Sequence, residues 1–186
     1  MTQHRRLAAV AALVLVPSIA LSACSSSSSS GGSSSASSSP TESASPSQSL
    51  VTTSLTADQV EVKGGITQAP EITFPTPSSA SELTTKDVVV GTGATVKAGD
   101  TITFSYTGVG ALSGEVFDSS WDRGQPLTYP LTNLITGWQQ GIPGMKVGGR
   151  RILVIPGDLA YGPNPPTQAI APNETLVFVM DVVKIG

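Results

Sequence analysis

The sequence predicts an α+β fold in which a twisted antiparallel β-sheet wraps around one short α-helix. Two observations predict it. Short segments of alternating apolar residues recur between glycine- and proline-rich turns, a pattern typical of antiparallel strands. Only one stretch, near 132–140, has the spacing and the end signals of a short helix. At 186 residues, the chain is long enough for one such domain with extensions.

The first 23 residues have the layout of a secretory signal peptide. Arg5 and Arg6 give a basic start, an apolar run follows from Leu7, and small residues precede Cys24. The run is shorter than the roughly 20 residues that a membrane span needs. The segment ending at Cys24, the only cysteine of the chain, resembles the lipobox of bacterial lipoproteins, in which that residue carries a diacylglycerol. We therefore expect an exported protein, anchored through lipid on Cys24 to the outer face of the cytoplasmic membrane or to the cell envelope. An ordinary secreted protein is the alternative.

Residues 24–50 are predicted to form a disordered tether, because the segment is almost entirely serine and has little to bury. As a flexible coil it would span about 25–30 Å. Residues 51–86 follow as an N-terminal arm or linker. A leading strand is expected within 58–74, although Gly64 and Gly65 interrupt its pattern.

The strongest pattern occupies 87–186, which we predict to be the main domain. Ile102, Phe104 and Tyr106 alternate on one face of a half-buried strand, and Pro130 suits an edge strand. The full set of predicted strands is 88–90, 101–106, one that begins at Val116, 127–131, 150–155 and 176–185.

One short helix is predicted between the fourth and fifth of these strands. Thr132 or Asn133 would cap it, and glycine and proline follow its expected last residue, Gln140. Leu134 and Trp138, four residues apart, would lie on the same face.

Composition excludes several classes of function. A net charge of −3 with no basic run gives no electrostatic basis for nucleic-acid binding. His4 is the only histidine, so we expect no metal site and no cofactor, and Ser–His or Cys–His catalysis is unavailable once the signal peptide is removed. Arg150 and Arg151 are expected to be a solvated strand end.

Seven segments in the second half of the chain resemble the FKBP family of peptidyl-prolyl isomerases, in the same order. They are 106–108, 116–120, 137–141, 145–151, 155–156, 160–162 and 172–178. For example, residues 116–120 are Val-Phe-Asp-Ser-Ser and residues 137–141 are Gly-Trp-Gln-Gln-Gly. Each segment alone is a weak signal. Their common order and spacing over 87–185 identify the chain as a member of that family.

The resemblance implies a ligand pocket between the helix and the sheet. Trp138 would be its floor and Asp118 the polar residue beside its walls. The walls would come from Tyr106, Phe117, Tyr161 and Phe178, with Leu127, Leu134, Ile135 and Ile170 as further substrate-binding residues. Leu127 stands where the family often has phenylalanine, so this wall is less aromatic than usual, and we expect the difference to affect specificity more than activity.

The activity implied by the resemblance is cis–trans isomerisation of X–Pro bonds in exported polypeptides. Unfolded, proline-containing chains would be the substrates, macrolides are the implied ligands, and a monomer is the default expectation. Two alternatives stay open: a non-catalytic binding module or holdase that keeps the pocket, and an unrelated extracytoplasmic hydrolase or solute-binding lipoprotein.

Overall fold

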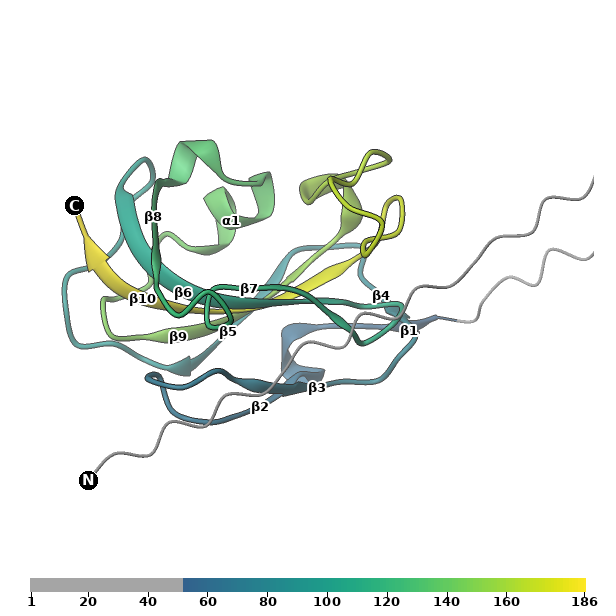
Figure 1. The fold of residues 1–186 in the computed structure, drawn as a ribbon, viewed down its shortest axis with the longest axis horizontal. Helices are drawn as coiled ribbons and strands as arrows, with labels where there is room; N and C mark the ends of the chain where they lie inside the picture. The colour runs from purple at the N-terminus through teal and green to yellow at the C-terminus, as the bar shows by residue number, and fades with distance from the viewer. Residues whose placement is uncertain (1–51) are drawn as a thin grey trace, which may run out of the picture. The chain divides into compact units, whose positions relative to one another are not determined.

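A sheet of six antiparallel strands organises this computed structural model, which describes residues 52–186. In spatial order they are β5 (Thr84–Val89), β9 (Arg150–Ile155), β10 (Leu176–Ile185), β6 (Thr101–Gly110) and β7 (Val116–Ser119), with β8 (Leu127–Pro130) paired to the start of β6. The helix α1 (Thr136–Gly141) lies against one face (Figure 1). The predicted fold class is confirmed. The predicted signal peptide, tether and lipid site at Cys24 lie outside the described residues.

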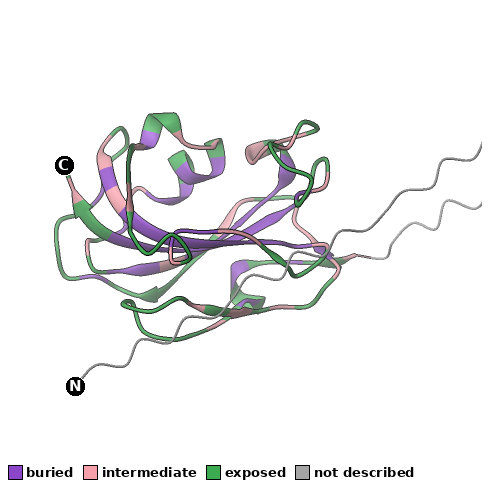
Figure 2. Cartoon of the chain, viewed as in Figure 1, coloured by how far each residue is buried: buried purple, intermediate pink, exposed green. Residues whose placement is uncertain are grey.

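Alternation along the strands builds the inner core beneath α1. Successive side chains of a strand point to opposite faces, so Ile102, Phe104 and Tyr106 of β6 face the same way, as predicted. Phe178 and Met180 of β10 pack with them. Figure 2 shows the buried residues running along these central strands. Trp138 of the helix closes this core from above the sheet.

The opposite, outer face of the sheet is covered by residues 52–83, here called the arm (Figure 1). It contains β1 (Thr53–Ser54), the 3-10 turn η1 (Ala57–Gln59), β2 (Glu61–Lys63), β3 (Glu71–Thr73) and β4 (Ser78–Ser79). Leu55, Ala57 and Val60 are buried against apolar side chains of β6, β9 and β10. The described residues 52–186 belong to one compact unit, so the arm is a second layer of the same unit as the sheet.

Buried polar groups fasten the arm to the sheet. Arg150 has a fully buried side chain that pairs with Asp181 of β10 and donates to the carbonyl oxygens of Gly64 (3.1 Å) and Gln68 (2.9 Å). The expectation of a solvated strand end is therefore wrong for Arg150. Its partner on the sheet and its acceptors in the arm are far apart in sequence, so no local pattern marks them. Arg151 is also largely buried and pairs with Asp87.

Several predicted elements differ in extent, among them the strand expected at 101–106, which continues to Gly110 of β6. The strand expected within 58–74 is instead η1 followed by the hairpin β2–β3, because Gly64 adopts φ +98° and turns the chain back. The strand expected at 88–90 begins earlier, at Thr84 of β5. The predicted helix divides into a 3-10 turn, η2 (Leu131–Asn133), and α1.

The division of the helix has a local cause. Leu134 is extended, with φ −102° and ψ 169°, so α1 starts after Ile135 rather than at Thr132 or Asn133. The last short element, η3 (Gly157–Leu159), follows β9. Across residues 52–186, the structure contains no helix with the length and apolar character needed to span a bilayer.

Candidate functional site

A pocket of about 220 Å³ opens on the helix side of the sheet. Side chains of β6, β7, β8, β10 and α1 line it, together with the segment before α1 and the loop after η3. The lining residues are Phe104, Tyr106, Phe117, Asp118, Leu127, Tyr129, Leu134, Ile135, Trp138, Tyr161 and Phe178. The structure thus brings together every predicted site residue within its described range except Ile170.

Trp138 forms the floor and is 5% exposed. Its indole meets three rings edge to face: Phe104 and Tyr106, each at 5.2 Å between centroids, and Phe178 at 5.0 Å. Such pairs contribute about 0.5–1.5 kcal/mol beyond burial alone, so the floor is held rigidly. The helix can lie this close to the sheet because residue 137 is a glycine. A Cβ at Gly137 would come within 2.4 Å of the Ile155 side chain.

The aromatic wall of Phe117 and Phe178 depends on an irregularity in the sheet. The register between β6 and β7 shifts at Gly108 and Val109, which pair with Asp118 and Val116 and leave Phe117 as the extra residue. A bulge of this kind re-aims a side chain. Phe117 packs at 89° to Phe178, with centroids 5.6 Å apart.

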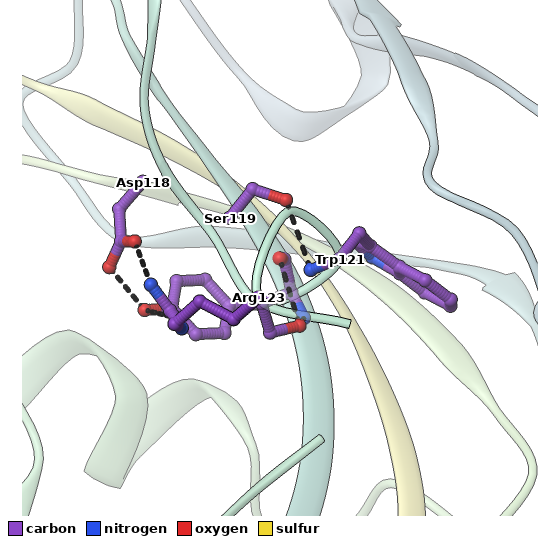
Figure 3. Close-up of polar contacts among 6 residues, drawn as sticks. Asp118, Ser119, Trp121 and Arg123 are labelled. Atoms are coloured by element: carbon purple, nitrogen blue, oxygen red, sulfur yellow. Dashed lines mark hydrogen bonds and ion pairs between the residues drawn. The ribbon is translucent and has the colours of Figure 1, made fainter. Parts of the chain in front are cut away.

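A polar group borders this wall and consists of Tyr106, Asp118 and Arg123. The Tyr106 hydroxyl donates to the carboxylate of Asp118. Arg123 donates to the same carboxylate (Figure 3). Nη2 of Arg123 also donates to the Tyr106 oxygen over 2.9 Å, and its guanidinium lies 5.5 Å from the centre of the Tyr106 ring. The carboxylate therefore orients the phenol.

The two titratable members of the group have opposite pKa shifts. Burial, and then the hydrogen bond to Asp118, raise the pKa of Tyr106 to about 12. Burial alone would raise the pKa of Asp118, but hydrogen bonds from Tyr106 and Arg123 outweigh it and hold that pKa below its ordinary value of 3.8. At neutral pH the site thus holds a neutral phenol and a carboxylate neutralised by a guanidinium.

Arg123, Phe104 and Tyr129 belong to the site or its border but were not predicted as site residues. Phe104 shares the inward face of β6 with Tyr106, so strand alternation could have placed it there. Tyr129 follows Leu127 by two residues on β8 and could have been found by the same argument. Arg123 sits in the loop after β7, where no periodicity applies, and no signal in the sequence marks it.

The remaining rim residues have polar groups available to a ligand. Within residues 52–186, the Tyr161 hydroxyl makes no hydrogen bond to another protein group, nor does the backbone N–H of Ile135. Burial raises the pKa of Tyr161, and the charge of Asp118 adds to the effect, so its hydroxyl remains a donor at neutral pH. Ile170, by contrast, is buried in the core cluster that includes Trp138 and does not line the pocket.

Comparison with known proteins gives a consistent set of relatives. A family model described as FKBP-type peptidyl-prolyl cis-trans isomerase matches residues 93–183. A probable FK506-binding protein of Corynebacterium glutamicum is 47% identical over 116 residues, which are 62% of this chain and 98% of that protein. An FK506-binding protein of Streptomyces anulatus is 46% identical over 121 residues, 63% of this chain and 98% of that one.

Solved structures agree with these sequence matches. The crystal structure of AtFKBP13 is similar with a TM-score of 0.52 and 37% identity, and the match covers 57% of this chain and 94% of that chain. Because residues 52–186 make up more of the chain than that match covers, part of the described structure has no counterpart in it.

Proposed function

The chain belongs to the FKBP-type peptidyl-prolyl cis-trans isomerase family, and from this premise we propose that the aromatic pocket is where it isomerises X–Pro bonds. The observation that carries the proposal is the floor and walls of the pocket. Trp138 is packed edge to face with Tyr106 and Phe178, and Phe117 completes a largely apolar space of about 220 Å³.

Such a pocket can accelerate rotation without forming a covalent bond. The barrier of about 18–20 kcal/mol arises because rotation breaks amide resonance. A twisted amide has lost the charge separation of the planar form, so an apolar, water-poor site favours it over the hydrated ground state. Each 1.36 kcal/mol of that preference increases the rate about tenfold.

Polar groups on the rim would hold the substrate in register with the apolar floor. The free N–H of Ile135 and the hydroxyl of Tyr161 can donate to substrate carbonyl groups. Asp118, held by Arg123, keeps the Tyr106 phenol fixed in the wall. No residue in this scheme changes its protonation state, which agrees with a reaction that transfers no proton.

The test is the cis-to-trans exchange of a short X–Pro peptide in the presence of the protein. We expect strong acceleration that the macrolide FK506 blocks, and a large loss in Phe117→Ala, which removes a partly exposed wall. Val116→Ala, an exposed neighbour on the same strand, is the matched control and retains activity. A folded protein that gives no acceleration on any of several peptides, yet binds unfolded chains, would instead support the holdase alternative.

We propose further that the chain works outside the cytoplasm, tethered through lipid on Cys24. The basic and apolar start, the small residues before a single cysteine and the serine-rich segment support this proposal. Mass spectrometry of the protein from a bacterial host should find a diacylglycerol on Cys24, and Cys24→Ala should release the protein from the membrane fraction. Recovery of unmodified Cys24, or of an intact N-terminus, would contradict the anchor.

A further inference from the structure

We infer that Glu174 is a positioning residue of the isomerase site, an inference that rests on the proposed function. Glu174 is 5% exposed, and its carboxylate accepts two backbone hydrogen bonds from different parts of the chain. Oε1 accepts from the N–H of Leu112 over 3.0 Å, and Oε2 accepts from the N–H of Ala171 over 2.7 Å. One buried side chain thereby joins the turn after β6 to the loop before β10.

Both segments lead directly to the pocket. The turn of Leu112 connects β6 to β7, and β7 carries the two wall residues Phe117 and Asp118. The loop of Ala171 begins after Tyr161 and includes Ile170, which packs in the core with Trp138. Since the carboxylate fixes the distance between these segments, it fixes the wall on β7 relative to the rim at Tyr161.

Gly110, which has no side chain, leaves room for the carboxylate of Glu174. A Cβ on Gly110 would lie 2.6 Å from Oε1, although the backbone of Gly110 is in a conformation that alanine can adopt. Beside it, the N–H of Ala111 donates to the carbonyl of Thr175 over 3.0 Å. A buried carboxylate that accepts N–H bonds makes strong, charge-assisted contacts, and an unpaired one is costly.

Glutamine tests the contact at nearly constant size. A carboxylate accepts at both oxygens, whereas an amide accepts at one atom and only donates at the other. Glu174→Gln therefore leaves either Leu112 or Ala171 without an acceptor. Gly110→Ala displaces the carboxylate in a second way that leaves its charge unchanged. Glu115→Gln, an exposed acid of the same turn, makes the same charge change as the glutamine variant.

The experiment measures kcat/KM for an X–Pro peptide, thermal unfolding, and hydrogen exchange of the Leu112 and Ala171 amides by NMR, all in the full chain. We expect Glu174→Gln and Gly110→Ala to lose about tenfold in kcat/KM, which is equivalent to about 1.4 kcal/mol of transition-state stabilisation. Both variants should also expose the Leu112 and Ala171 amides to exchange. Glu115→Gln should stay within about twofold. Ile152→Val, buried on the outer face of the sheet, serves as a variant that loses stability away from both segments.

Several outcomes would overturn the inference. One is that folded variants of Glu174 and Gly110 keep full activity. Another is that Ile152→Val loses as much activity at a matched loss of stability. A third is that both variants fail to fold, which would make the contact a requirement of folding. An inactive wild-type protein would instead remove the proposed function, and this is the one result in which the two claims fail together.

Discussion

Arg150 and Asp181 form a bidentate ion pair on the outer face of the sheet, with 2.6 Å between Nε and Oδ1 and 2.7 Å between Nη2 and Oδ2. The Arg150 side chain is 0% exposed, and the remaining donors of its guanidinium reach the carbonyl oxygens of Gly64 and Gln68 in the arm. The buried guanidinium thus has its counter-charge in the sheet and its other hydrogen-bond acceptors in the arm. The arm is therefore part of the folded domain and supplies acceptors that this buried charge needs.

Asp181→Asn should destabilise the protein severely, because it leaves the buried guanidinium without its counter-charge. Breaking a buried pair from one side costs about 3–5 kcal/mol. Urea unfolding followed by Trp fluorescence measures the change. Lys86→Ala, which removes a solvent-exposed ion pair with Asp58 between the same two layers, is the control and should cost at most about 1 kcal/mol. Equal, small losses in both variants would show that the arm is not docked through Arg150.

Leu55→Ala should test the apolar part of the same interface. Leu55 is buried between the arm and the outer face of the sheet, and truncation of a buried leucine typically costs about 2–5 kcal/mol. Ile66→Ala, in the same arm but partly exposed, should change stability by less than about 0.5 kcal/mol. Thermal unfolding of the two variants beside the wild type measures both stability changes. A small loss of stability in Leu55→Ala would mean that the apolar contacts of the arm contribute little to the stability of the fold.

The sequence predicts a strand well where alternating apolar residues are bounded by turns. It predicts a site residue well where a family motif lies on such a strand. Strands β9 and β10 have the predicted bounds, because each is an apolar run bounded by turns. The arm was not predictable as a second layer. Arg150 contacts the arm through acceptors in a loop more than 80 residues earlier, and sequence periodicity carries no information about such a contact.

The same limit applies to the pocket, where long-range contacts bring residues together that no local pattern connects. Arg123 reaches Asp118 and Tyr106 from an irregular loop, and only the folded geometry brings the three together. The family resemblance alone implied that Ile170 contacts the ligand, as the apolar residue at the tip of a late loop. The structure buries it in the core cluster that includes Trp138, and it does not line the pocket.

The ionisation of Tyr106 gives a prediction that depends on pH. Its pKa is raised to about 12 by burial and by the hydrogen bond to Asp118, so the stability that its neutral form contributes is complete below pH 10.0 and is lost as pH rises to about 12. Ultraviolet titration of the phenols, with Tyr106→Phe to identify the signal, measures this pKa. Asp118→Asn should lower it, since the carboxylate is one of the groups that raise it. An unchanged pKa in this variant would contradict the contact.

The isomerase activity should be almost independent of pH between about 5 and 9 for the same reason. Asp118 has a pKa below its ordinary value of 3.8 and Tyr106 has one of about 12, so neither changes charge in this range. The only histidine of the chain is His4, outside the pocket residues. The measurement is kcat/KM across this range at constant ionic strength. A bell-shaped profile centred near neutrality would mean that the rate depends on a group other than these two.

Gly108→Ala should damage the pocket wall and leave the fold intact. A Cβ at Gly108 would lie 2.6 Å from Cζ of Phe117 and 2.8 Å from Cε1 of Phe178, so both rings must move away from the positions that form the wall. We expect kcat/KM to fall about tenfold or more, because about 1.36 kcal/mol of lost transition-state stabilisation is enough for that change.

The stability cost of the same substitution should be modest, about 1–3 kcal/mol, as for other overpacked sites, because Phe117 lies at the edge of the core and its ring can swing toward solvent. Gly65→Ala is the matched control. It places a methyl group where no atom lies within 4 Å and should change neither activity nor unfolding. If Gly108→Ala keeps full activity while FK506 still binds, the Phe117–Phe178 wall contributes nothing to the isomerisation step, and Trp138 with the rim donors would have to supply the acceleration alone.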